Sequence, residues 1–161
     1  MAFDFLQRLP FIGAVATHKI VLTTTGTESV TAEKLMQELL TSLPETLAVA
    51  LIYAETGRTL ATYTTTGQYN LSKAASLTAT MVRQAHGALN ALGLADDPIE
   101  DVLITLGNQL HLVRLLAGGE WLLYVVAHSP DTNLALVRAV MEACAKQHDT
   151  SEAADSTTAD L

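Results

Sequence analysis

The chain has 161 residues, of which 49% are hydrophobic and only 16% are charged, and its formal net charge is -8. Its length predicts one domain with a sizeable buried core, and no apolar run approaches the roughly 20 residues that span a bilayer. The negative charge argues against a nucleic-acid or anionic-membrane surface, because either would need a basic patch.

Residues 1–28 are predicted to form an N-terminal arm, which contains all three phenylalanines of the chain (Phe3, Phe5 and Phe11). The arm docks on a partner or membrane surface, or it packs on its own domain. We favour its own domain, because apolar side chains usually bury close by. Within the arm, residues 18–24 are compatible with a short strand. The apolar run 9–16 has no net basic region before it, so we expect no secretory signal and a cytoplasmic protein.

Two helices and two strands are predicted in the next part of the chain. Apolar residues at helical spacing indicate a helix over residues 31–43, which Pro44 ends. The apolar run 47–54 predicts a buried strand, and the Thr-rich run 59–65 predicts its hairpin partner at a sheet edge. The longest helix is predicted over residues 71–92. Its many small side chains would let a second helix approach closely, although an alanine-rich surface helix is the simpler interpretation.

Three strands joined by tight turns follow, and then a last helix. Gly107-Asn108 between two apolar runs is typical of a two-residue hairpin turn. Residues 121–127 are apolar throughout and are predicted to lie at the centre of the sheet, whereas residues 99–106 begin with acidic side chains and are predicted to form an edge. Ser129-Pro130-Asp131 is predicted to start the helix 133–146.

The acidic tail 148–161 has no apolar pattern and no Lys or Arg, and we predict that it is disordered. Residues 29–147 are then one domain of the α/β (α+β) class, in the order α-β-β-α-β-β-β-α. Strands that are apolar on both faces need cover on both sides. We therefore expect a five-stranded antiparallel sheet with helices on both faces, in a profilin-like or Roadblock-like sandwich.

No catalytic, metal or cofactor site is predicted. Residues 13–19 are similar to a phosphate-binding loop but lack its second glycine and its Ser/Thr. The five histidines show no metal-binding spacing. The single cysteine, Cys144, excludes an intramolecular disulfide and lies on the apolar stripe of the last helix, where we expect a core residue. The chain is expected to be non-enzymatic, and its few charges indicate a partner that covers apolar surface.

Four segments carry a resemblance to a known family: Val102–Thr105, Leu112–Arg114, Trp121–Val126, and Asp131–Leu134 with Val137-Arg138 after it. Together with the order of elements over residues 31–146, they resemble the Roadblock / dynein-light-chain superfamily. The resemblance implies a homodimer whose edge strands pair across a two-fold axis, with the long helices side by side. The candidate interface residues are Ala75, Ala79, Val82, Val102, Ile104 and Leu106.

The resemblance also implies binding to a small Ras-like GTPase, because bacterial members commonly serve such GTPases, some as GTPase-activating partners. Of the arginines at positions 58, 83, 114 and 138, Arg83 is the leading candidate contact, since an arginine supplied in trans can stabilise phosphoryl transfer. Lys73, Thr80 and Gln84 share its side of the long helix. The simpler interpretation of Arg83 is a solvated side chain.

Two functions follow. The first is a Roadblock-type regulator or scaffold that changes the localisation or GTP hydrolysis of its GTPase. The second is a small-molecule sensor or adaptor of profilin- or PAS-like architecture, which would need a pocket on the sheet. A ligand that copurifies with the protein would favour the sensor, and a nucleotide-dependent protein partner would favour the regulator.

Overall fold

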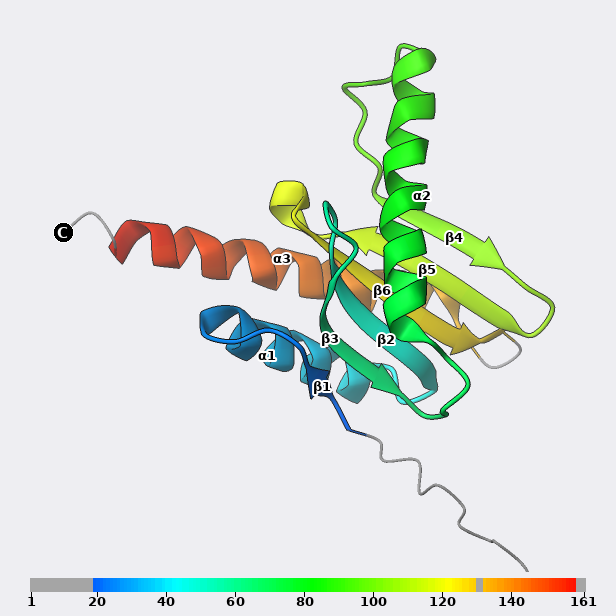
Figure 1. Ribbon diagram of the computed structural model, residues 1–161, viewed down its shortest axis with the longest axis vertical. Helices are drawn as coiled ribbons and strands as arrows, with labels where there is room; N and C mark the ends of the chain where they lie inside the picture. The colour runs from blue at the N-terminus through cyan, green and yellow to red at the C-terminus, as the bar shows by residue number, and fades with distance from the viewer. Residues whose placement is uncertain (1–18, 130–131, 159–161) are drawn as a thin grey trace, which may run out of the picture.

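Figure 1 shows the computed structural model, which describes residues 19–129 and 132–158, with the backbone alone for residues 149–158. Its elements in chain order are β1 (Val21–Leu22), α1 (Thr27–Ser42), β2 (Thr46–Tyr53), β3 (Thr59–Thr64), α2 (Leu71–Ala91), β4 (Asp101–Thr105), β5 (Gln109–Leu115), the 3-10 helix η1 (Ala117–Gly119), β6 (Trp121–His128) and α3 (Leu134–Thr158). The order differs from the predicted one, because the strand β1 comes before α1.

The sheet has six strands in the order β1-β3-β2-β6-β5-β4, and every neighbouring pair is antiparallel. The prediction of five strands was therefore wrong by one. The additional strand β1 pairs with β3, with Val21 opposite Thr62, and residues 1–18 of the predicted arm lie outside the described residues. The sequence was compatible with a short strand over residues 18–24, but a strand of two residues is too short to produce a period-two pattern, so its place in the sheet was not predicted.

The centre and one edge of the sheet are as predicted. Strand β6 lies between β2 and β5, and β4 is the edge beyond β5. The two-residue turn between β4 and β5 is closed by a hydrogen bond of 2.8 Å from the Leu106 amide to the Gln109 carbonyl. The prediction that β3 lies at an edge was wrong, because β1 pairs with its outer side and β3 lies between β1 and β2.

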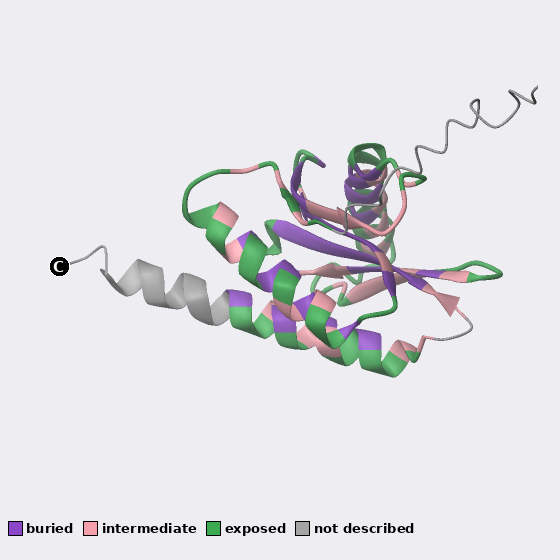
Figure 2. Cartoon of the chain, turned by 90° about the horizontal axis from the view of Figure 1, so that it is seen from below, coloured by how far each residue is buried: buried purple, intermediate pink, exposed green. Residues whose placement is uncertain are grey.

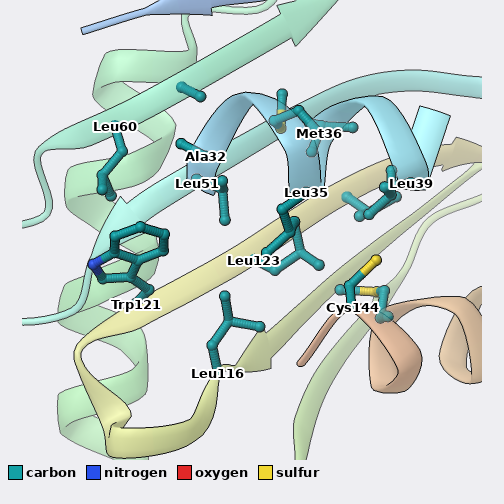
Figure 3. Packing of buried hydrophobic residues seen from close by; sticks show 14 of the residues in the cluster. Ala32, Leu35, Met36, Leu39, Leu51, Leu60, Leu116, Trp121, Leu123 and Cys144 are labelled. Carbon is teal, nitrogen blue, oxygen red and sulfur yellow. The ribbon is translucent and has the colours of Figure 1, made fainter. Parts of the chain in front are cut away.

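Helices cover both faces of the sheet, as Figures 1 and 2 show. On one face, α1 and α3 pack on the main core, in which Met36 of α1 and Cys144 of α3 meet Leu51 and Leu123 of the sheet (Figure 3). Trp121 belongs to this layer and contacts the Tyr53 ring edge-on at 6.5 Å between ring centroids and the His148 ring at 4.6 Å. On the other face, α2 packs on a second cluster from the sheet.

The helix ends differ from the predictions in three places. Helix α1 begins four residues earlier, at Thr27. Helix α3 begins at Leu134, capped by the Asn133 side chain, which accepts the Ala135 amide at 3.0 Å; the predicted Pro130-Asp131 start lies outside the described residues. Helix α3 also continues to Thr158, through residues that the sequence assigned to a disordered tail. An apolar stripe marks where a helix is buried, and a helix continues beyond its packed part when its backbone bonds are satisfied.

Helix α2 ends at Ala91, and Gly93 just after it adopts a positive φ of 74°. Its first turn is capped by the Asn70 side chain, which accepts the Lys73 amide at 3.0 Å. Within the described residues, no helix is long and apolar enough to cross a bilayer.

Candidate functional site

An apolar surface lies exposed along α2 and β4. Leu77 on α2 and Leu92 directly after this helix are 61% and 72% exposed, and Ile104 on β4 and Leu106 directly after this strand are 40% and 48% exposed. Met81 follows Leu77 by four residues and Leu92 follows Met81 by eleven, which are about one and three helical turns. The three side chains therefore lie along one flank of the helix. We call Leu77, Met81, Leu92, Val102, Ile104 and Leu106 the α2–β4 surface.

Both parts of this surface lie on the same side of the molecule. Val102 packs against the cluster beneath α2, and side chains two residues apart on a strand share a face, so Ile104 also lies on the α2 side of β4. Figure 1 shows α2 crossing that face of the sheet close to β4. Strand β4 is the sheet's edge, and its outer side has no strand partner among the described residues. Such an edge is a template for pairing with another chain.

The three predicted interface residues on α2 have a different environment. Ala75 and Ala79 are completely buried and Val82 nearly so, all within the protomer's own core. The turn between β2 and β3 packs on this part of the helix, and a Cβ atom at Gly57 would lie only 2.7 Å from the Ser76 Cα. This turn, rather than a second helix, accounts for the small side chains. The place of Ala75, Ala79 and Val82 in a dimer interface stays a prediction. Leu77 was not among the predicted interface residues, because it lies beside the apolar stripe of α2.

The predicted GTPase contacts form a ridge on the solvent side of α2. Arg83 donates from Nη1 to the carbonyls of Ala54 and Glu55, at 3.1 and 2.9 Å, and from Nη2 to Thr80 Oγ1 at 3.0 Å. The structure therefore brings Arg83 and Thr80 together, and it fixes the guanidinium on the β2–β3 turn. Lys73 and Gln84 are exposed on the same ridge.

The other arginines also have specific partners. Arg138 forms two hydrogen bonds of 3.0 Å with the carboxylate of Asp101, at the start of β4, and Arg114 lies 3.9 Å from the same carboxylate. Arg58 lies above the Tyr53 ring, 5.1 Å from its centroid. The Tyr53 hydroxyl donates to Glu28 at 2.5 Å, and this bond, together with one from Thr24, holds the pKa of the Glu28 carboxyl below its usual value.

A chain of polar side chains lies beneath the α2–β4 surface. His111 is opposite Ile104 in the sheet, and its Nδ1 lies 2.7 Å from the Tyr124 hydroxyl. Its Nε2 is 3.2 Å from Gln109 Oε1, and the Gln109 amide in turn donates to the Tyr69 hydroxyl at 2.9 Å. Burial lowers the pKa of His111, because the charged imidazolium loses hydration, and burial raises the pKa of Tyr124.

The described residues contain no group of three or more His, Cys, Asp or Glu side chains placed to hold a metal ion. Cys144 is buried, and burial raises the pKa of its thiol to about 11, so it stays protonated near neutral pH. The sensor hypothesis requires a pocket on the sheet. The buried side chains of Leu122, Tyr124 and Val126 occupy the face of the sheet beneath α2. This packing does not favour the sensor hypothesis.

Solved structures share this architecture. Myxococcus xanthus MglB superposes with a TM-score of 0.71 at 17% sequence identity, over 83% of this chain and 96% of that chain. A Roadblock/LC7 domain from Streptomyces avermitilis superposes with a TM-score of 0.59 at 19% identity, over 73% of this chain and 94% of that chain. The chain has a Roadblock fold.

The Roadblock fold also relates the chain to the gliding protein MglB of Thermus thermophilus, with a TM-score of 0.63 at 21% identity, over 77% of this chain and 90% of that chain. No protein-family model matches the sequence, and no curated protein matches it either. The Roadblock fold is therefore visible in the arrangement of helices and strands, while the sequence identity to these three solved structures is 17% to 21%.

Proposed function

We propose that this chain is a non-enzymatic, homodimeric regulator or scaffold of the Roadblock type that binds a small Ras-like GTPase. The α2–β4 surface is the observation that carries the proposal. It combines exposed apolar side chains with an unpaired strand edge, at the place where the family resemblance puts the dimer contact. The proposed regulator would act through non-covalent contacts of its surface, without a cofactor or a covalent step.

A second copy suits the α2–β4 surface on physical grounds. Antiparallel pairing of two β4 edges would satisfy the outward N–H and C=O groups of both strands. The same contact would bury Ile104 and Leu106 of each copy, and full burial of such a side chain is worth roughly 1.5–3 kcal/mol. Exposed leucines on the flank of α2 extend the contact toward the size of stable interfaces, about 1,200–2,000 Å² in total.

The ridge of α2 is the surface that we assign to the GTPase. In this proposal Lys73 and Gln84 contact the GTPase directly. Arg83 has a supporting role, since its guanidinium already donates to three oxygen atoms of its own protomer. The regulator would then change the rate of GTP hydrolysis by positioning residues of the GTPase itself, or would change only the location of the GTPase.

Affinity capture from the native lysate tests the proposal. The tagged protein is the bait, with a non-hydrolysable GTP analogue in one arm and GDP in the other. The ridge variant Lys73→Glu with Gln84→Arg and the control Lys34→Glu, an exposed lysine on α1, are used in parallel. We expect wild type and control to retain a Ras-like GTPase in the triphosphate arm, and the ridge variant to lose it. Recovery of no GTPase in either arm would overturn the proposal.

A further inference from the structure

A chain of hydrogen bonds on the α2 side of the sheet holds His111 in its neutral form. The Gln109 amide nitrogen donates to the Tyr69 hydroxyl, which leaves Gln109 Oε1 facing His111 Nε2 at 3.2 Å. A carbonyl oxygen can only accept, so Nε2 carries the proton of the ring. Nδ1 then accepts the proton of the Tyr124 hydroxyl at 2.7 Å. Both ring nitrogens are therefore satisfied in one tautomer of the neutral ring.

A second proton on the His111 ring breaks this chain. It would lie on Nδ1 and point at the Tyr124 oxygen, so the tyrosine would have to turn its own proton away. Tyr124 is only 8% exposed, and His111 is its one hydrogen-bond partner among the described residues. His111 itself is half-buried, so in a single protomer water can reach the ring and accept this proton.

The groups that face His111 provide no negative charge to stabilise an imidazolium. The titratable side chains on this face come from β6 and from the segment before α2, and they are Tyr124, His128 and Tyr69. The residue opposite His111 on β4 is Ile104, and α2 faces the sheet with apolar side chains. The carboxylate of Asp101 on β4 lies on the α3 side, where it accepts hydrogen bonds from Arg138.

We propose that protonation of His111 opposes association through the α2–β4 surface, so that acidification separates the two copies. The inference rests on the proposed dimer. Ile104 belongs to the α2–β4 surface and lies directly opposite His111, so a second copy that covers Ile104 also removes water from the ring. The charged ring then loses its remaining hydration, and the displaced Tyr124 proton loses its water acceptor. The dimer therefore binds fewer protons than two separate protomers.

The pH range of the effect follows from this difference in bound protons. The dissociation constant should be constant above the pKa of His111 in the free protomer, and it should rise as the pH falls through that pKa. Burial already lowers the pKa of His111 in the protomer below the ordinary value of about 6.5. The dimer should therefore be tightest at neutral and alkaline pH and weaken under mildly acidic conditions.

Sedimentation equilibrium of the full-length protein at several pH values tests the inference. From pH 7.5 to pH 5.5 we expect the dissociation constant of the wild type to rise by about fivefold or more. His111→Gln should still dimerise at pH 7.5 and should hold its dissociation constant within about twofold over this range. His128→Gln removes the neighbouring histidine on the same face and is the matched control, which should keep the wild-type response.

Tyr124→Phe tests the same chain without removing the histidine. Loss of the hydroxyl leaves Nδ1 without its donor, which favours protonation of the ring, so the dissociation constant should begin to rise at a higher pH than in the wild type. A wild-type dissociation constant that is independent of pH, or a response that persists in His111→Gln, would overturn the inference and leave the dimer standing. A wild-type protein that is monomeric at pH 7.5 would overturn both.

Discussion

The two halves of α2 differ in what surrounds them. From Leu71 to Val82 the helix packs on the sheet and on the β2–β3 turn, and Ala75 and Ala79 are fully buried. From residue 83 to residue 91 every side chain is exposed or only partly buried, and Figure 1 shows this part of the helix standing clear of the sheet. The protomer alone explains the first half, apart from Leu77, which is 61% exposed. The second half still contains apolar side chains, which is the signature of a surface that a partner covers.

The buried half should respond most strongly to added volume. Gly57 has a φ of 70°, and a Cβ atom there would meet the backbone of Ser76. We expect Gly57→Ala to lower the free energy of unfolding by about 2–4 kcal/mol, through strain and overpacking. Chemical denaturation measures the change. A change below 0.5 kcal/mol would show that the turn moves away from α2 at little cost.

The exposed surface should respond in association rather than in folding. We expect Ile104→Lys to weaken dimerisation at least tenfold, about 1.4 kcal/mol, because the lysine would have to be desolvated in the contact. Sedimentation equilibrium measures the dissociation constant. The control Val30→Lys changes an equally apolar side chain, 68% exposed on α1, and should leave dimerisation unchanged. A wild-type protein that stays monomeric at high micromolar concentration would contradict the prediction.

Arg83 lies at the boundary between the two halves, and its role separates two interpretations. If it mainly holds the β2–β3 turn, Arg83→Lys should lower the free energy of unfolding by about 1 kcal/mol, since an ammonium cannot reproduce the forked contacts. GTP hydrolysis by the captured GTPase should then change little. A loss of about 1,000-fold or more in stimulated hydrolysis, with folding intact, would instead identify an arginine finger.

The exposed half should tolerate a larger side chain and gain from it. No atom lies within 4 Å of a Cβ built at Gly87. We therefore expect Gly87→Ala to raise the free energy of unfolding by about 0.5–1 kcal/mol, the helix propensity difference between the two residues. Thermal unfolding measured beside Gly57→Ala gives the contrast directly. Destabilisation by Gly87→Ala would mean that a close neighbour packs on this part of α2 in solution.

The smallest effect concerns pH. Burial lowers the pKa of His111, so the folded state favours the neutral ring. This contribution to stability is fully present above the unfolded pKa of about 6.5 and declines as the pH falls below it. Below pH 6.5, the free energy of unfolding of the wild type should therefore fall relative to that of His111→Gln. The variant His86→Gln, which changes an exposed histidine on α2, is measured in parallel. A constant difference from pH 5 to pH 8 would contradict the prediction.

Much of the fold could be predicted because its elements are long and regular. The apolar strand β6 and the two-residue turn at Gly107-Asn108 are local signals, and both are confirmed. The sequence was compatible with a short strand over residues 18–24, but the pairing of β1 depends on its distant partner β3, which no local pattern indicates. The end of α3 could not be predicted from the apolar pattern, because the backbone of a helix can continue beyond the last residue of its apolar stripe.

The candidate site was less predictable because it depends on contacts between distant residues. Ala75 and Ala79 are small because a turn 20 residues earlier in the chain packs on them, which the helix sequence alone cannot reveal. Arg83 was correctly placed on the solvent side of α2. Its carbonyl partners Ala54 and Glu55 come from a different element and could be identified only in the structure.

Trp121 is the only tryptophan of the chain, and it lies in the layer between the sheet and the pair α1 and α3. Its ring touches His148, so its fluorescence reports whether the last helix stays in place. Events on the opposite face, at α2 and β4, should leave that emission unchanged. The native protein thus contains an optical probe of one layer only. Its signal can be compared with sedimentation data to separate detachment of α3 from dissociation of the dimer, without any added dye.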